Sequence, residues 1–98
     1  MPTSREIIDL LAKQRQELRA LGVRRLALFG SAARDEATEN SDLDFVVELE
    51  RRTFDGYMDV KEFLERLFQK PIDLVVSEAL KPQLKSHILQ EAIYAEGL

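Results

Sequence analysis

The sequence lacks several features, and each absence excludes a class of protein. It has no cysteine among its 98 residues, so we expect no disulfide and no thiolate metal site, and nothing points to an oxidising compartment. No apolar run reaches the ~18 residues of a membrane span, and no signal-peptide core follows the start. Basic residues number 14 against 18 acidic ones, which argues against a surface that grips nucleic-acid phosphates regardless of sequence. We expect one cytoplasmic domain over residues 1–98, with neither membrane nor nucleic acid as a direct partner.

Apolar periodicity and turn residues predict alternating helices and strands. The Thr3/Glu6 spacing of a capping box opens the first helix, and Gly22 closes it. The expected helices cover about residues 4–21, 32–34, 57–69 and a segment after Pro82. The expected strands cover residues 23–29, 42–49 and 72–76. This order, α-β-α-β-α-β-α, predicts an α/β (α+β two-layer) fold with a three-stranded sheet and about four helices.

Three aspartates stand at strand entrances. Asp42 and Asp44 lie two residues apart, so both carboxylates face the same side of their strand. Asp73 begins the 72–76 strand, and it would meet them if the two strands are parallel neighbours. Converging carboxylates repel one another, and a hard cation such as Mg²⁺ removes that conflict. The alternative is that these aspartates are turn residues or helix caps.

A second cluster lies at the end of the 23–29 strand. Gly30 lets the backbone approach a ligand closely, and the Ser31 hydroxyl with the amides after it could bind a phosphate. Arg34 lies one turn further on, within reach of phosphate oxygens. An ordinary turn and a solvated arginine are the alternatives. If both clusters serve one site, the first two strands are antiparallel and the last two parallel, which predicts a mixed sheet.

Residues 28–47 combine these features into a recognisable pattern: Gly-Ser, ten residues, then Asp-x-Asp, with a further aspartate on a later strand. This pattern resembles the signature of the DNA polymerase β-type nucleotidyltransferase superfamily, and the length and element order resemble its minimal nucleotidyltransferase (MNT) branch. Two departures stand out. Asp35 follows the arginine where relatives often have glycine, adding negative charge near the phosphate-binding residues, and Lys70-Pro71 replaces a glycine-containing turn.

The resemblance implies roles for seven residues. Catalysis and the binding of two Mg²⁺ ions would fall to Asp42, Asp44 and Asp73. Nucleotide binding would fall to Gly30, Ser31 and Arg34, which would hold the β- and γ-phosphates of ATP, and to Ser41, which would orient the first carboxylate. The reaction would transfer a nucleotidyl group to an acceptor hydroxyl and release pyrophosphate, with Asp73 as the general base.

Members of this branch are commonly encoded beside a HEPN-domain toxin. The resemblance therefore implies a hetero-oligomeric partner and the role of antitoxin in a type VII-like toxin–antitoxin pair, by AMP transfer from ATP to a tyrosine of that toxin. Two alternatives stay open: inhibition by binding and occlusion without essential catalysis, and nucleotidyl transfer to another acceptor such as a small molecule.

The remaining aromatic and histidine residues favour structural roles. Phe54 and Tyr57 flank Gly56 and are interpreted as core anchors, with adenine stacking as the functional alternative. His87, the one histidine, is interpreted as a surface or partly packed residue rather than a metal ligand.

Overall fold

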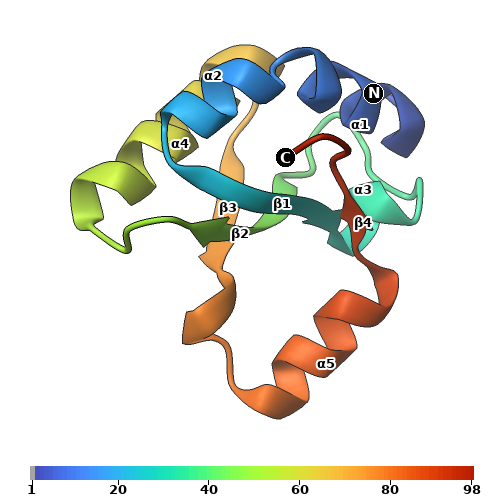
Figure 1. The fold of residues 1–98 in the computed structure, drawn as a ribbon. Helices are drawn as coiled ribbons and strands as arrows, with labels where there is room; N and C mark the ends of the chain where they lie inside the picture. The colour runs from blue at the N-terminus through green and yellow to red at the C-terminus, as the bar shows by residue number, and fades with distance from the viewer. Residues whose placement is uncertain (1) are drawn as a thin grey trace.

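The computed structural model describes residues 2–98 and consists of a four-stranded sheet with helices on both faces (Figure 1). The helices are α1 (Ser4–Lys13), α2 (Arg15–Ala20), α3 (Gly30–Ala33), α4 (Phe54–Phe68) and α5 (Pro82–Glu91), with a 3₁₀ turn at Ser77–Ala79. The strands are β1 (Val23–Phe29), β2 (Leu43–Leu49), β3 (Ile72–Val76) and β4 (Ile93–Tyr94), in the spatial order β3-β2-β1-β4. The α+β class predicted from the sequence is confirmed.

The pairing of the strands confirms the predicted mixed sheet. Strand β1 runs antiparallel to β2, and β2 runs parallel to β3. The expected count of three strands is wrong, because β4 adds a fourth at the β1 edge. This strand has two residues, too few for an alternating pattern, and Ile93 continues the apolar spacing of the preceding helix. Its strand geometry comes from pairing with Ala27 and Leu28 of β1.

The first predicted helix is divided into α1 and α2 at Gln14, whose φ of −101° and ψ of 15° interrupt the helix. No proline or glycine marks this position, so the pattern predicts one continuous helix. The described residues therefore form five α-helices and one 3₁₀ turn rather than about four helices. The predicted ends are confirmed: Thr3 and Glu6 form the capping box, and Gly22 has a φ of +90°.

The two faces of the sheet are covered unequally. On one face, β1, β2 and β3 pack against α1, α2 and α4 and form the main core, in which Phe45 stacks on Phe68 with ring centroids 5.8 Å apart. On the other face a small cluster of Ala27, Val46 and Ile88 joins the sheet to α5. Since side chains alternate along a strand, the even-numbered residues of β2 face α5. Asp44 therefore lies on the thinly covered face.

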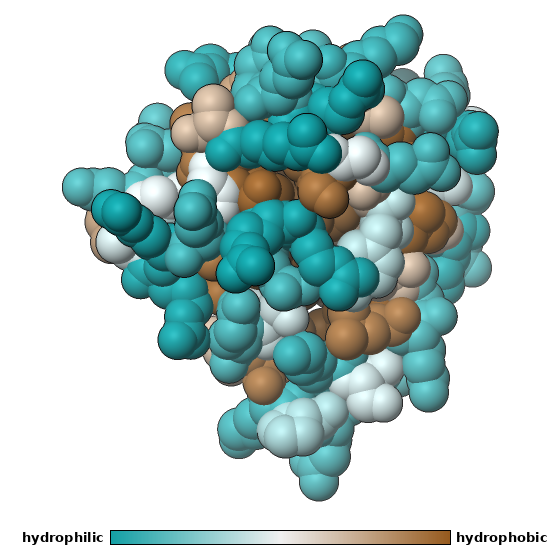
Figure 2. All heavy atoms as spheres, viewed as in Figure 1, coloured by the Kyte–Doolittle hydropathy of each residue, from teal (hydrophilic) through white to brown (hydrophobic). Residues whose placement is uncertain are grey.

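One face of the molecule is mostly polar. Figure 2 shows charged and polar side chains over most of the viewed face, with apolar atoms visible between them. No helix within residues 2–98 has the length and apolarity needed to cross a membrane.

Candidate active site

Strand register brings three of the proposed site residues to one end of the sheet. Phe29, the last residue of β1, pairs with Asp44 of β2, and Asp44 pairs in turn with Asp73 of β3. Gly30 follows directly after Phe29 and begins α3. The end of β1 and the beginnings of β2 and β3 therefore meet, as the topology argument requires. Two aspartates and the Gly-Ser connection lie together although up to 43 residues separate them in the chain.

Asp44 is the electrostatically strained member of this group. Partial burial, then the negative charge of Asp73 and a side-chain hydrogen bond with Asp73, together raise the pKa of Asp44 from 3.8 to about 6. The charge of Asp42 acts in the same direction, whereas the charge of Arg34 lowers the pKa. Like charges are therefore held together here, and a bound cation would favour the ionised form of both carboxylates.

Gly30 is in contact with Asp44 in a way that only glycine allows. Its φ is +73°, and a Cβ atom at this position would lie 3.1 Å from Asp44 Cγ and closer still to Oδ2. A side chain would therefore displace the carboxylate and strain the backbone. The glycine inferred to permit close approach to a ligand already permits close approach to Asp44.

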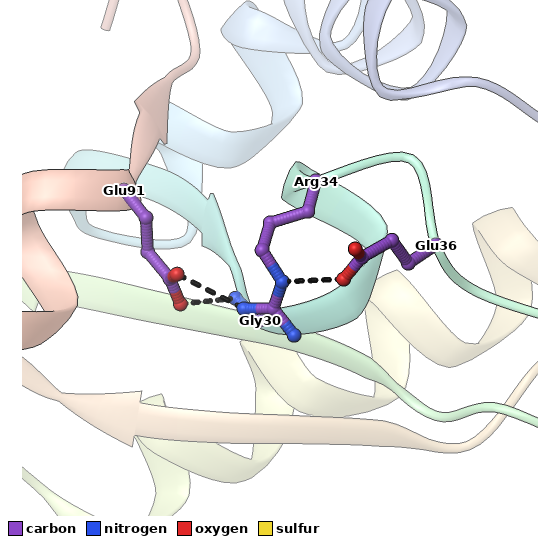
Figure 3. A network of polar contacts seen from close by, with 4 residues as sticks. All are labelled: Gly30, Arg34, Glu36 and Glu91. Carbon is purple, nitrogen blue, oxygen red and sulfur yellow. Dashed lines mark hydrogen bonds and ion pairs between the residues drawn. The ribbon is translucent and has the colours of Figure 1, made fainter.

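A polar network links the Gly-Ser connection to the C-terminal helix (Figure 3). Arg34 donates from Nε to Glu36 Oε1 at 2.7 Å and from Nη1 to Glu91 Oε2 at 2.9 Å. The other oxygen of Glu91, Oε1, accepts the Gly30 N–H at 3.1 Å. Sequence reasoning missed Glu91 because it lies 57 residues after Arg34 at the end of α5, and no local pattern connects the two.

The structure places the other proposed site residues less closely together. Ser31 lies half-buried in α3. Ser41 accepts the Thr38 N–H at 2.9 Å, so its hydroxyl closes a turn instead of contacting a carboxylate. Asp42 is exposed just before β2. Among residues 2–98, no three His, Asp or Glu side chains are gathered closely enough to hold one ion. Asp44 and Asp73 are thus brought together, and Asp42 acts on Asp44 as a nearby charge.

Asp35, the residue that departs from the family pattern, has the backbone conformation that favours glycine. Its φ is +57°, in the left-handed region. The carboxylate accepts the Ser4 N–H at 2.7 Å and the Ser4 hydroxyl at 3.0 Å. Its negative charge is therefore placed at the first turn of α1, where a helix favours an anion. Gln69, just before Lys70-Pro71, shows the same conformation with a φ of +54°.

Tyr57, Phe54 and His87 differ in how far they are buried. Tyr57 is a core anchor, as expected: it packs against the main core and donates from its hydroxyl to the Leu74 carbonyl at 2.6 Å. The same interpretation is wrong for Phe54, whose side chain is 77% exposed at the first residue of α4. His87 is exposed on α5, as expected for a surface residue.

The chain is similar in sequence and in fold to known proteins. Residues 11–95 match the family model of the nucleotidyltransferase domain. A protein adenylyltransferase of Thermococcus cleftensis, MntA, is 36% identical over 96% of this chain and 97% of its own. A provisionally assigned protein adenylyltransferase of Methanocaldococcus jannaschii is 35% identical over 96% of this chain and 99% of its own.

The solved structures give the same fold. A protein provisionally assigned as a minimal nucleotidyltransferase has a TM-score of 0.73 and 36% identity, over 88% of this chain and 93% of the other. One chain in the structure of a tri-AMPylated Shewanella oneidensis HEPN toxin in complex with MNT antitoxin has a TM-score of 0.65 and 17% identity, over 93% of this chain and 73% of the other. The chain belongs to the nucleotidyltransferase domain family, in its minimal nucleotidyltransferase branch. It is a nucleotidyltransferase enzyme.

Proposed function

We propose that this enzyme is a Mg²⁺-dependent protein adenylyltransferase that transfers AMP from ATP to a tyrosine hydroxyl of a HEPN toxin. It would thereby act as the antitoxin of a type VII-like toxin–antitoxin pair. The observation that carries the proposal is the register of Asp44 opposite Asp73 beside Gly30. Further support comes from the Thermococcus relative, which is named a protein adenylyltransferase and matches nearly end to end. The Shewanella complex supplies the class of partner to test.

The donor set fits Mg²⁺. Asp44 and Asp73 offer hard carboxylate oxygens from neighbouring strands. The pKa of Asp44 is raised by burial and then by repulsion from Asp73, and a divalent cation would favour the ionised form against both effects. Asp42 would complete the set. When bound, two ions in such a site stabilise the attacking and leaving oxygens of a phosphoryl transfer.

The chain's own residues have distinct tasks in the proposed reaction. Ser31, with the amides of the Gly-Ser connection, and Arg34 would hold the β- and γ-phosphates, so that the α-phosphorus faces Asp73. The tyrosine oxygen forms a bond to the α-phosphorus, and the bond from that phosphorus to the bridging α–β oxygen breaks. Pyrophosphate leaves with the electron pair, and Asp73 accepts the phenolic proton. Ser41 stays a candidate for orienting Asp42, because a hydroxyl that accepts the Thr38 N–H still has its own proton to donate.

The position of the site suits a macromolecular acceptor. Asp42 and Asp73 are both exposed, and the α5 face of the sheet is thinly covered. A tyrosine on another protein can therefore approach the base without a domain movement. We propose a hetero-oligomer for this reason, with the partner supplying the acceptor side of the site.

The direct test is the intact mass of the HEPN partner after incubation with this enzyme, ATP and Mg²⁺. We expect one or more added adenylyl groups, lost with Asp44→Asn and Asp73→Asn and retained with Asp59→Asn. The last variant is a matched control, since Asp59 is an exposed aspartate of α4. An unmodified toxin that Asp44→Asn neutralises as well as the wild type would instead establish inhibition by occlusion. Transfer to a small molecule but not to the toxin would establish another acceptor.

A further inference from the structure

The carboxylate of Glu91 lies against the residues proposed to bind phosphate. Each oxygen of the Glu91 carboxylate accepts a donor that the proposed function assigns to nucleotide phosphates. Oε1 accepts the Gly30 N–H at 3.1 Å, and Oε2 accepts Arg34 Nη1 at 2.9 Å (Figure 3). A carboxylate that bridges a backbone amide and a guanidinium has the geometry in which a phosphate group binds the same two donors.

The charges around Arg34 leave no net attraction for a further anion. Glu36 accepts from its Nε and Glu91 from its Nη1, so one guanidinium faces two carboxylates. The hydrogen bond from Arg34 lowers the pKa of Glu91, which keeps that carboxylate ionised at neutral pH. Release of Glu91 frees Arg34 Nη1 as a donor and removes one of the two carboxylates that repel a polyphosphate.

We propose that the Glu91 carboxylate is an internal competitor for the phosphate-binding donors, and that the polyphosphate of the nucleotide displaces it from Gly30 and Arg34. This proposal rests on the proposed function, because it assigns those donors to the nucleotide. Glu91 then sets the affinity of the site for nucleotide, and α5 takes part in nucleotide binding.

Displacement of Glu91 is physically easy. The side chains of Arg34 and Glu91 are 46% and 27% exposed, so the ion pair between them is solvated and weak. The main chain just beyond Glu91 is fixed, since Ile93 pairs with Leu28 in the sheet. Release therefore requires rotation of one glutamate side chain and leaves the fold in place. Glu36 differs, because it binds Arg34 without reaching Gly30.

The test compares the wild type with Glu91→Gln, which removes the charge and keeps an oxygen that can accept the Gly30 N–H. Isothermal titration calorimetry with Mg²⁺ would measure the Kd of ATP and of inorganic tripolyphosphate. We expect Glu91→Gln to lower both Kd values about 2- to 5-fold, the range for loss of one exposed competing pair. Glu62→Gln, which removes an exposed charge on α4, should leave both unchanged.

Unchanged or higher Kd values for Glu91→Gln overturn the proposal, and higher values would mean that Glu91 holds the connection in its binding conformation. A ¹H–¹⁵N spectrum gives a second readout that needs no variant. Saturating tripolyphosphate should shift the Gly30 amide resonance of the wild type, and an unmoved resonance overturns the proposal. The two proposals fail separately. If Glu91→Gln binds ATP more tightly but the wild type transfers no AMP to the toxin, only the proposed function is refuted. If the wild type transfers AMP and the Kd of ATP is the same for both proteins, only the competition by Glu91 is refuted.

Discussion

Replacing Asp44 by asparagine should stabilise the metal-free protein at neutral pH. The pKa of Asp44 rises from 3.8 to about 6 in the folded state, mainly through burial and then through the charge of Asp73. A difference of about 2 pKa units corresponds to about 3 kcal/mol of unfavourable ionisation. Asp44 is only half-buried, so solvent screening reduces this, and we expect a gain of about 1 kcal/mol for Asp44→Asn.

The sign of the pH dependence follows from which state binds more protons. Between pH 3.8 and about 6 the unfolded chain has lost the Asp44 proton that the folded chain retains. The wild type therefore loses stability relative to Asp44→Asn as the pH rises through this window, and the full difference is present above it. Urea unfolding in EDTA at about pH 4 and about pH 7 measures both ends.

Asp59→Asn neutralises an exposed aspartate of α4 and should change stability little at either pH. Adding Mg²⁺ should stabilise the wild type more than Asp44→Asn, because binding to the folded state alone adds to its stability. An Asp44→Asn variant that is no more stable than the wild type at about pH 7 would refute the electrostatic strain assigned to this site.

Three further predictions concern backbone conformation and packing. Gly30→Ala should lower the free energy of unfolding by about 1–2 kcal/mol, because position 30 has a positive φ. The added Cβ should also displace Asp44 and so reduce the stabilisation by Mg²⁺. Thermal melts with and without Mg²⁺ measure both effects, and a variant identical to the wild type would contradict the contact between Gly30 and Asp44. Asp35→Ala should be more destabilising than Asp35→Gly, because both variants lose the hydrogen bonds to Ser4 but only glycine adopts the positive φ without strain. Urea unfolding measures both free energies, and an alanine variant more stable than the glycine variant would contradict this explanation. Tyr57→Phe should lower stability by about 1 kcal/mol through loss of its hydrogen bond to β3, and an unchanged urea midpoint would contradict that role.

Local patterns predicted the elements that have strong local causes. The capping box at Thr3, the glycine at position 22 and the apolar runs of β1, β2 and β3 are each visible within a few residues of sequence. Asp42 and Asp44 share a face for an equally local reason, the alternation of side chains along a strand. The strand directions also followed, since only one topology brings the Gly-Ser connection and the aspartates to the same end of the sheet.

Features with no local cause escaped prediction. The break at Gln14 involves no proline or glycine, and β4 exists only because β1 offers an unpaired edge. Phe54 is apolar in sequence and yet exposed, because α4 begins at that residue and the buried positions of the helix come later. In each case the outcome depends on what the rest of the fold places next to the residue.

The sequence by itself determined which glycine, serine and aspartate residues the proposed site can use and how they are spaced along the chain, because both are properties of the primary structure. Only the tertiary structure decided which charges meet. It placed Asp44 opposite Asp73 across a parallel pair of strands, and it brought Glu91 from the far end of the chain onto Gly30 and Arg34. The physical reason is that electrostatic interactions depend on distance in space, which the chain sets only when it folds.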